Sequence, residues 1–258
     1  MNILVIIKPI PYVADEENYQ DTNFLNDSDI NVIAEALDLR DSCGGKVTVM
    51  AVGAPEGEAV LKEAYTYGVD SAVLVTDTVW RDLDIRNAGQ LAAAAAVHSG
   101  PYDLVLFGRQ AIDGDAAHMS AMTAGYLQLP LIAYANGFTI ENNHINACCT
   151  GDRMNVKLQA KLPAVVMSLS EKKRGRYPAV SDIMKAYNGT YRVRIITSRE
   201  LTITGLEKTV RLYRTYEPVI SRRRQMIFNE MDETEMAEKL DEILFSLGYL
   251  QKMEGAGE

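Results

Sequence analysis

Residues 103–130 read DLVLFGRQAIDGDAAHMSAMTAGYLQLP, and this stretch decides how the rest of the chain is interpreted. It begins with the apolar run Asp103–Phe107, passes through a loop, and continues as a helix over Ala116–Leu129. A helix that begins beyond a strand gathers unpaired N–H groups at one point, and its macrodipole favours an anion there. The stretch therefore predicts a strand–loop–helix unit that binds a phosphate or pyrophosphate.

The composition of this loop suits a ligand, although a purely structural role has about even weight. Gly108 and Gly114 permit close approach of the backbone to a ligand, and Ala116 keeps side chains out of the way. In the structural alternative, Asp115 only caps the helix and the glycines only turn the chain. His118 falls in the first helical turn, where it reaches a ligand or lies on the helix surface. The loop carries no Walker lysine, and no GxGxxG follows the first strand, so we predict a binding loop without catalytic residues.

The first 135 residues alternate between strands and helices. Apolar runs of strand length are each followed by a segment with helical spacing, and glycines separate them. This order predicts an α/β fold with a Rossmann-like parallel sheet, helices on both faces, and ligands beyond the carboxyl ends of the strands. The expected strands are Ile3–Lys8, Lys46–Val52, Ala72–Thr76 and Asp103–Phe107, and the expected helices are Asp29–Asp41, Glu56–Tyr67, Asn87–His98 and Ala116–Leu129.

After Pro130 the hydrophobic period changes to that of strands. A hairpin about Glu141–Asn143, an alternating run over Met154–Ala160 and an apolar run over Leu162–Leu169 predict a strand extension of the sheet. A short helix is expected over Ser181–Ala186, and residues 187–229 show no core pattern. Asp232–Leu247 is expected to form an amphipathic helix, whose apolar stripe needs a partner.

The net charge of −9 is unevenly distributed. Residues 1–70 carry −9, residues 71–150 carry −4, residues 151–229 carry +11 and residues 230–258 carry −7. Surfaces of opposite sign suit protein partners better than the basic stripe expected for nucleic acid.

Composition excludes several further classes of protein. No apolar run approaches the roughly 20 residues of a membrane span, and the run Ile3–Ile7 is too short for a secretory core. Three cysteines and three scattered histidines predict neither a disulfide framework nor a metal site. We therefore expect a cytoplasmic protein with no membrane insertion, no metal and no catalytic side chain of its own.

Two motifs together resemble the beta subunit of electron-transfer flavoproteins. GRQAIDGDAA at Gly108–Ala117, with MTAGYL behind it, is similar to the adenine-nucleotide loop of that family. KLPAVV at Lys161–Val166, followed by RYPAVSDIMKA at Arg176–Ala186, is similar to its partner-recognition loop and the helix after it. The resemblance covers about residues 1–186.

The resemblance implies a subunit that pairs with an alpha subunit and carries electrons between flavin dehydrogenases and an acceptor. Such a beta subunit binds AMP or, in electron-bifurcating members that react with NADH, FAD. Gly114 and Asp29 favour FAD here, with AMP as the alternative. Residues 1–186 would form the nucleotide- or flavin-binding domain, with the partner-recognition loop near residues 170–186, and residues 187–258 an arm and helix that dock on the alpha subunit. Because Lys172 replaces a leucine anchor of the recognition loop, an acyl-CoA dehydrogenase is only one of the partners to consider.

The resemblance also assigns residues. Those that would hold the nucleotide are Ile6, Asn26, Asp29, Val52, Gly53, Gly108, Arg109, Gln110, Ala111, Ile112, Asp113, Gly114, Asp115, Ala116, Ala117, His118 and Met119. Those that would dock the partner are Lys172, Lys173, Arg174, Arg176 and Tyr177. An alternative from another class is a stand-alone adenine-nucleotide-binding module of the universal-stress-protein type, which shares the sheet topology but is expected to end near residue 150.

Overall fold

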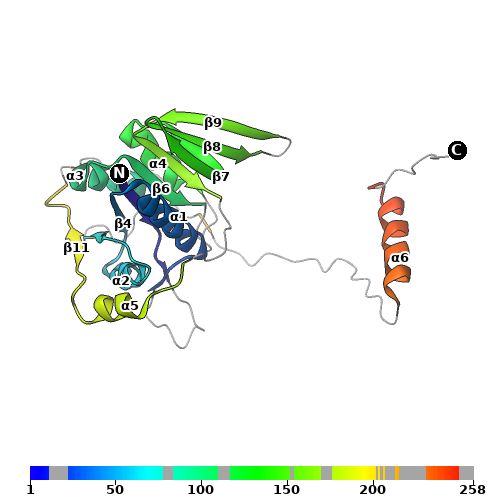
Figure 1. Ribbon diagram of the computed structural model, residues 1–258, viewed down its shortest axis with the longest axis horizontal. Helices are drawn as coiled ribbons and strands as arrows, with labels where there is room; N and C mark the ends of the chain where they lie inside the picture. The colour runs from blue at the N-terminus through cyan, green and yellow to red at the C-terminus, as the bar shows by residue number, and fades with distance from the viewer. Residues whose placement is uncertain are drawn as a thin grey trace. The chain divides into compact units, whose positions relative to one another are not determined.

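The computed structural model divides the chain into two compact units, Met1–Arg211 and Leu212–Glu258 (Figure 1). The residues that it describes are 1–11, 23–77, 84–109, 117–151, 154–169, 176–201, 203, 206, 213, 214 and 231–249.

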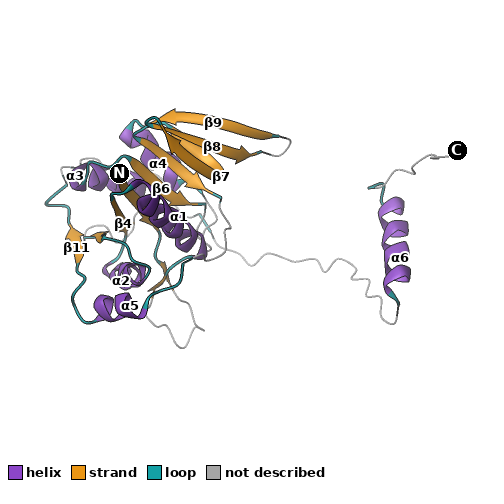
Figure 2. Ribbon diagram, viewed as in Figure 1, coloured by secondary structure: helices purple, strands orange, loops and turns teal. Residues whose placement is uncertain are grey.

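The first unit is built on one large sheet with helices packed against it (Figure 2). Over the described residues the sheet has nine strands in the order β11-β5-β4-β1-β6-β10-β7-β8-β9. Two residues each in β2 (Ile10–Pro11) and β3 (Asn23–Phe24) form a separate antiparallel pair. The strands of the large sheet are β1 (Asn2–Ile7), β4 (Lys46–Val52), β5 (Ser71–Val75), β6 (Leu104–Gly108), β7 (Leu131–Glu141), β8 (His144–Thr150), β9 (Asn155–Lys161), β10 (Ala164–Ser168) and β11 (Val193–Ile196).

The strands from β11 to β7 pair in parallel, and β7, β8 and β9 pair antiparallel. The parallel part contains the predicted Rossmann-like sheet, and the antiparallel part contains the predicted hairpin and the run over Met154–Ala160. The run Leu162–Leu169, which was expected in the extension, instead forms β10 inside the parallel part, between β6 and β7. Asn142 and Asn143 join β7 to β8 with φ values of 50° and 62°, the pattern of a two-residue type I′ hairpin turn. The predicted fold class is therefore confirmed.

Helices cover both faces of the sheet, because side chains along a buried parallel strand alternate between two cores. In β1, Ile3, Val5 and Ile7 pack with residues of α1, α2 and α5, whereas Leu4 and Ile6 pack with residues of α3 and α4. The helices are α1 (Asp27–Cys43), α2 (Glu58–Thr66), α3 (Ile85–Ser99), α4 (Met119–Leu127) and α5 (Val180–Tyr187), and a 3-10 turn at Pro55–Gly57 precedes α2.

Two sequence-based expectations for this unit are wrong. The helix expected from Ala116 begins at Met119, and its cap position is His118 rather than Asp115. Residues 187–229 were expected to lack a core pattern, yet β11 extends the sheet beside β5, and Ile196 and Leu201 are buried. The unit thus continues beyond α5 to Arg211.

The contact between α3 and α4 depends on a glycine. A Cβ built at Gly89 lies only 2.6 Å from the Cβ of Met122. We expect Gly89→Ala to lower the free energy of unfolding by about 1–3 kcal/mol, because the two helices must separate. A Cβ built at Gly125 of α4 meets no other atom within 4 Å. Gly125→Ala should therefore raise the free energy of unfolding by about 0.5–1 kcal/mol. Urea denaturation followed by circular dichroism compares the variants, and a change of the same sign in both would contradict this packing.

The second unit contains α6 (Glu233–Ser246), as the amphipathic pattern predicted. Asp232 accepts hydrogen bonds from the N–H groups of Thr234 and Glu235, and Glu235 bonds back to the Asp232 N–H, which completes a capping box. No residue of α6 is buried. Among the described helices of both units, none combines the length and the apolar character needed to cross a bilayer.

Candidate nucleotide-binding crevice

The candidate site, here called the crevice, is the edge of the sheet at which the three parallel strands β1, β4 and β6 end. β1 is the central strand, with β4 on one side and β6 on the other. Ile6 pairs with Met50 in β4 and with Phe107 in β6, so the three strands end at the same edge of the sheet. The chain continues from β1 toward one face and from β6 toward the other, and this is the topological switch point at which sheets of this class bind ligands.

The first turn of α1 fills one side of this edge. Asn26 is the N-cap residue, and its backbone oxygen accepts from the N–H groups of Asp29 and Ile30 at 2.9 and 3.0 Å. Its side chain does not cap the helix but donates to Ser28 Oγ at 2.7 Å. The segment before α1 is fixed by Glu63 of α2, whose half-buried carboxylate accepts from the Leu25 N–H at 3.2 Å. Asn26 and Asp29 are thereby held rigidly at the strand ends.

Asp29 is the most unusual group in the crevice. Its side chain is only 5% exposed, and its Oδ2 accepts from the Lys8 N–H at 3.0 Å, just beyond β1. No described residue donates a hydrogen bond to its Oδ1. Burial raises the pKa of Asp29 from 3.8 to about 7, against the lowering effects of the Lys8 N–H and the Lys8 charge.

Gly108 ends β6 directly against α1. A Cβ at this residue would lie 2.6 Å from Asp29 Oδ1, 2.7 Å from Ser28 Oγ and 3.0 Å from the Ser28 carbonyl carbon. Because real Cβ atoms do not come this close to other atoms, only glycine permits β6 and α1 to meet here. Gly108, which the sequence analysis linked to close approach of a ligand, is thus also required for the packing of β6 against α1.

Some of the other residues that were predicted to bind the nucleotide lie at the same edge of the sheet. Val52 ends β4, and the Gly53 N–H donates to the Val75 oxygen at 3.1 Å. Ile6 is buried in β1, and Arg109 is exposed just after Gly108. The remaining predicted loop residues, Gln110 to Ala116, lie outside the described residues.

The start of α4 offers donors for an anion. Ala117 has a left-handed φ of 48°, His118 is exposed and has no side-chain cap bond, and Met119 is the first helical residue. The hydroxyls of Ser120 and Thr123 are buried and have no hydrogen-bond partner in the described part of the chain. Whereas the first turn of α1 carries Asp27 and Asp29, the first turn of α4 carries no acidic residue. A phosphate is therefore compatible with α4 and not with α1.

Sequence reasoning missed two groups at these positions: Lys8 and Ser120. Lys8 follows the first strand, so the rule that ligands lie beyond strand ends was the available signal. Ser120 gave no signal, because its burial depends on tertiary packing. Of the predicted docking residues, Lys172, Lys173 and Arg174 lie outside the described residues. Arg176 and Tyr177 do not belong to the crevice, because Arg176 contacts Asp41 near the other end of α1.

The pKa of Asp29 predicts a pH dependence of stability. Because the folded-state pKa lies above the unfolded one, folding takes up a proton between about pH 4 and pH 7. The free energy of unfolding should therefore fall as the pH rises through this window, by at most about 1.4 kcal/mol per pH unit.

We expect Asp29→Asn to remove this dependence, so that the variant gains roughly 1–3 kcal/mol over the wild type between pH 4.5 and pH 8. Urea denaturation at a series of pH values measures the difference. Asp27→Asn, an exposed carboxylate in the same helical turn, serves as the control and should run parallel to the wild type. Parallel curves for Asp29→Asn and the wild type would contradict a buried, proton-binding Asp29.

Comparison with known proteins identifies the family. The family model described as electron transfer flavoprotein domain matches residues 18–172. The chain is 32% identical over 221 residues to the electron transfer flavoprotein subunit beta of Thermoanaerobacterium thermosaccharolyticum, covering 79% of this chain and 81% of that protein. It is 30% identical to the caffeyl-CoA reductase-Etf complex subunit CarD of Acetobacterium woodii, covering 72% and 75%. It is 32% identical to protein FixA of Bradyrhizobium diazoefficiens, covering 72% and 70%. The relative from T. thermosaccharolyticum is named as a beta subunit, and the chain belongs to the electron transfer flavoprotein family.

Proposed function

We propose that the chain is the beta subunit of an electron-transferring heterodimer, and that it holds an adenine nucleotide beyond the carboxyl ends of β1 and β6. The observation that carries this proposal is the meeting of Gly108, Asp29 and the Lys8 N–H at the switch point of the sheet. When bound, a flavin supplies the electron-carrying chemistry, and the protein supplies position and surroundings. The stress-protein alternative is not favoured, because the family match extends to residue 172.

The crevice favours one orientation of the nucleotide. Phosphate groups would lie toward α4, where His118 and Met119 begin the helix and Ser120 Oγ lacks a partner. The sugar or base would lie toward α1, where Asp29 Oδ1, which accepts from no described residue, suits a hydroxyl or amino donor. Gly108 and Asn26 would form the walls between these two ends.

We propose FAD as the nucleotide, with AMP as the alternative. Asp29, together with Gly114, supports FAD by its resemblance to electron-bifurcating members of the family. The A. woodii relative, a subunit of a caffeyl-CoA reductase-Etf complex, is consistent with that assignment. In an FAD-containing pair, NADH would be a further reactant, and the alpha subunit would hold the other flavin.

The proposed electron-transfer partner is a flavin dehydrogenase or reductase, and an acyl-CoA dehydrogenase is one such enzyme. The basic residues Lys172, Lys173 and Arg174, with the exposed Tyr177, support docking to an acidic protein surface. All three cysteines are free thiols, which fits the reducing cytoplasm as the location of the complex.

The test of this proposal is the nucleotide content of the complex. The chain is co-expressed with its alpha subunit, the complex is purified, and FAD and AMP are counted after acid release. Two FAD per heterodimer would support the bifurcating type, and one FAD with one AMP would support the alternative. A complex with no adenine nucleotide beyond the FAD of the alpha subunit would overturn the proposal.

A further inference from the structure

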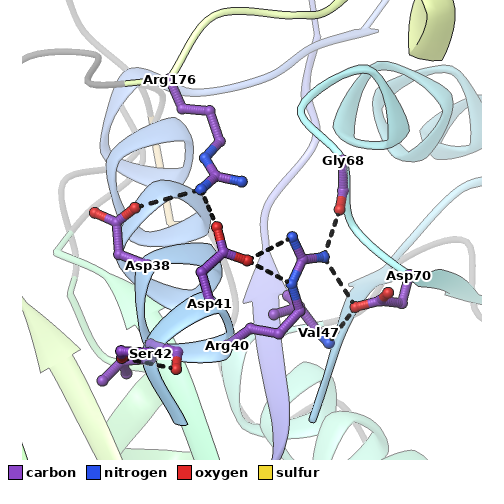
Figure 3. A network of polar contacts seen from close by, with 9 residues as sticks. Asp38, Arg40, Asp41, Ser42, Val47, Gly68, Asp70 and Arg176 are labelled. Carbon is purple, nitrogen blue, oxygen red and sulfur yellow. Dashed lines mark hydrogen bonds and ion pairs between the residues drawn. The ribbon is translucent and has the colours of Figure 1, made fainter. Parts of the chain in front are cut away.

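Arg176 turns back onto α1 instead of pointing into solvent (Figure 3). Its guanidinium forms an ion pair and hydrogen bond with Asp41 Oδ2, and its Nη2 lies 3.6 Å from Asp38 Oδ1. The Arg176 side chain is 30% exposed. Two carboxylates one helical turn apart thus neutralise a residue that lies 135 positions away from Asp41 in the sequence.

Asp41 is shared between two arginines. While Arg176 takes its Oδ2, Arg40 Nε and Nη2 donate to its Oδ1 at 3.1 and 3.0 Å (Figure 3). The hydrogen bonds from Arg176, and then those from Arg40, hold the pKa of Asp41 below its usual range. Asp41 is therefore ionised at neutral pH and holds both guanidiniums in place.

The second arginine anchors this pair to the sheet. Arg40 Nη1 donates to the Gly68 oxygen at 2.7 Å and to Asp70 Oδ2 at 3.2 Å. Asp70 Oδ2 in turn accepts from the Val47 N–H at 2.8 Å, at the start of β4. The carboxylate that Arg176 contacts is thus fixed to β4, to the turn before β5 and to α1, and it is a rigid support.

Beyond the contacts of Arg176, the segment is held mainly through α5. The Ala179 N–H donates to the Thr66 oxygen at 3.3 Å, Ala186 is buried against α2, and the Tyr191 hydroxyl donates to Asp182 at 3.3 Å. A cavity of about 430 Å³ lies under the segment, lined by Arg40, Asp70, Arg176 and Tyr191 among others. The opposite face of α5 is open to solvent, and its large apolar side chains are Val180, Ile183, Met184 and Tyr187.

We infer that Arg176 is a positioning residue, not a docking cation: its ion pair with Asp41 fixes residues 176–187 on α1, and so sets where the exposed face of α5 is presented. The importance of this position for electron transfer rests on the proposed function, because that segment overlaps the predicted partner-recognition loop near residues 170–186. A carboxylate of a partner protein would have to compete for Arg176 with Asp38 and Asp41, which already neutralise its charge. Because the pair is partly exposed, salt should weaken it.

Hydrogen–deuterium exchange of the full-length chain tests this inference. We expect Arg176→Gln and Asp41→Asn each to speed exchange of the α5 amides about 3- to 10-fold, and 1 M NaCl to do the same to the wild type. Arg176→Lys keeps the charge and should restore most of the protection. Asp38→Asn, which removes only the contact at 3.6 Å, is the matched control and should have a smaller effect.

The double variant separates a specific pair from general damage. If Arg176 acts through Asp41, then Arg176→Gln should add little in the Asp41→Asn background. Unchanged exchange in both single variants, or additive effects in the double variant, would overturn the inference. Nucleotide content should not change, because Asp29 and Asp41 lie about 18 Å apart along α1. Loss of the Arg176–Asp41 ion pair can therefore be distinguished from failure of the proposed function.

Discussion

Replacement of Gly108 by valine is expected to weaken binding of FAD or AMP at least about 100-fold, which is about 2.7 kcal/mol. The new Cβ would lie 2.6 Å from Asp29 Oδ1 and 2.7 Å from Ser28 Oγ, so β6 and α1 must separate where we propose that the nucleotide sits. The same overlap should lower the free energy of unfolding by about 1–3 kcal/mol. Equilibrium binding to the nucleotide-free protein and urea denaturation measure the two effects.

Gly137→Val is the matched control. Gly137 also lies in a strand of the sheet, but a Cβ there would have nothing within 4 Å. This variant should bind nucleotide as the wild type does. If Gly108→Val folded and bound the nucleotide with unchanged affinity, the edge of the sheet beyond β1 and β6 would not be the binding site.

Charged substitutions on the apolar face of α6 are expected to weaken the heterodimer about 10- to 1000-fold. Leu240 and Leu247 are 55% and 64% exposed, although fully burying a leucine contributes about 1.5–3 kcal/mol. If this face docks on the alpha subunit, Leu240→Asp with Leu247→Asp would place two charges in an apolar contact. Because α6 has no buried residue within the chain itself, the double variant should not disturb the fold of residues 1–211.

The control for this prediction is the acidic side of the same helix. Glu238→Gln with Asp241→Asn changes two exposed carboxylates and should leave the affinity for the alpha subunit within about threefold of the wild type. Titration of the alpha subunit against each purified chain gives the dissociation constants. Equal affinities for the leucine variant and the wild type would contradict docking through α6.

The parallel sheet was predictable because its strands are buried on both faces. Lys46–Val52 was expected as a strand, and β4 has the same bounds. α6 was equally clear, since an apolar stripe with acids opposite it needs no tertiary information. The structure adds the capping box at Asp232.

Other elements depend on contacts that the sequence does not reveal. β11 is four residues long, and only Ile196 among them is buried. It exists because its backbone pairs with β5, more than 100 residues earlier in the chain. The start of α4 was placed too early because the stretch Ala116–His118 has helical composition, although Ala117 adopts a left-handed conformation.

The candidate site was predictable as a location but not in its chemistry. Strand ends and glycines pointed to Gly108, and the family resemblance pointed to Asp29, yet the high pKa of Asp29 follows from burial that only the packed chain creates. Arg176 illustrates the same limit. In the sequence it belongs to a basic run and suggests docking, whereas in the structure Asp41 already binds it.

Photoaffinity labelling with 8-azido-AMP and 8-azido-FAD most directly tests whether the nucleotide lies beyond the carboxyl ends of β1 and β6. The labelled chain is digested, and the modified peptides are identified by mass spectrometry, with unlabelled AMP and FAD as competitors. We predict competable labels confined to peptides that contain residues 6–8, 26–29, 52–53 or 108–119. Competable labels confined instead to peptides around Arg40 and Arg176, or labels that neither competitor removes, would contradict the assignment.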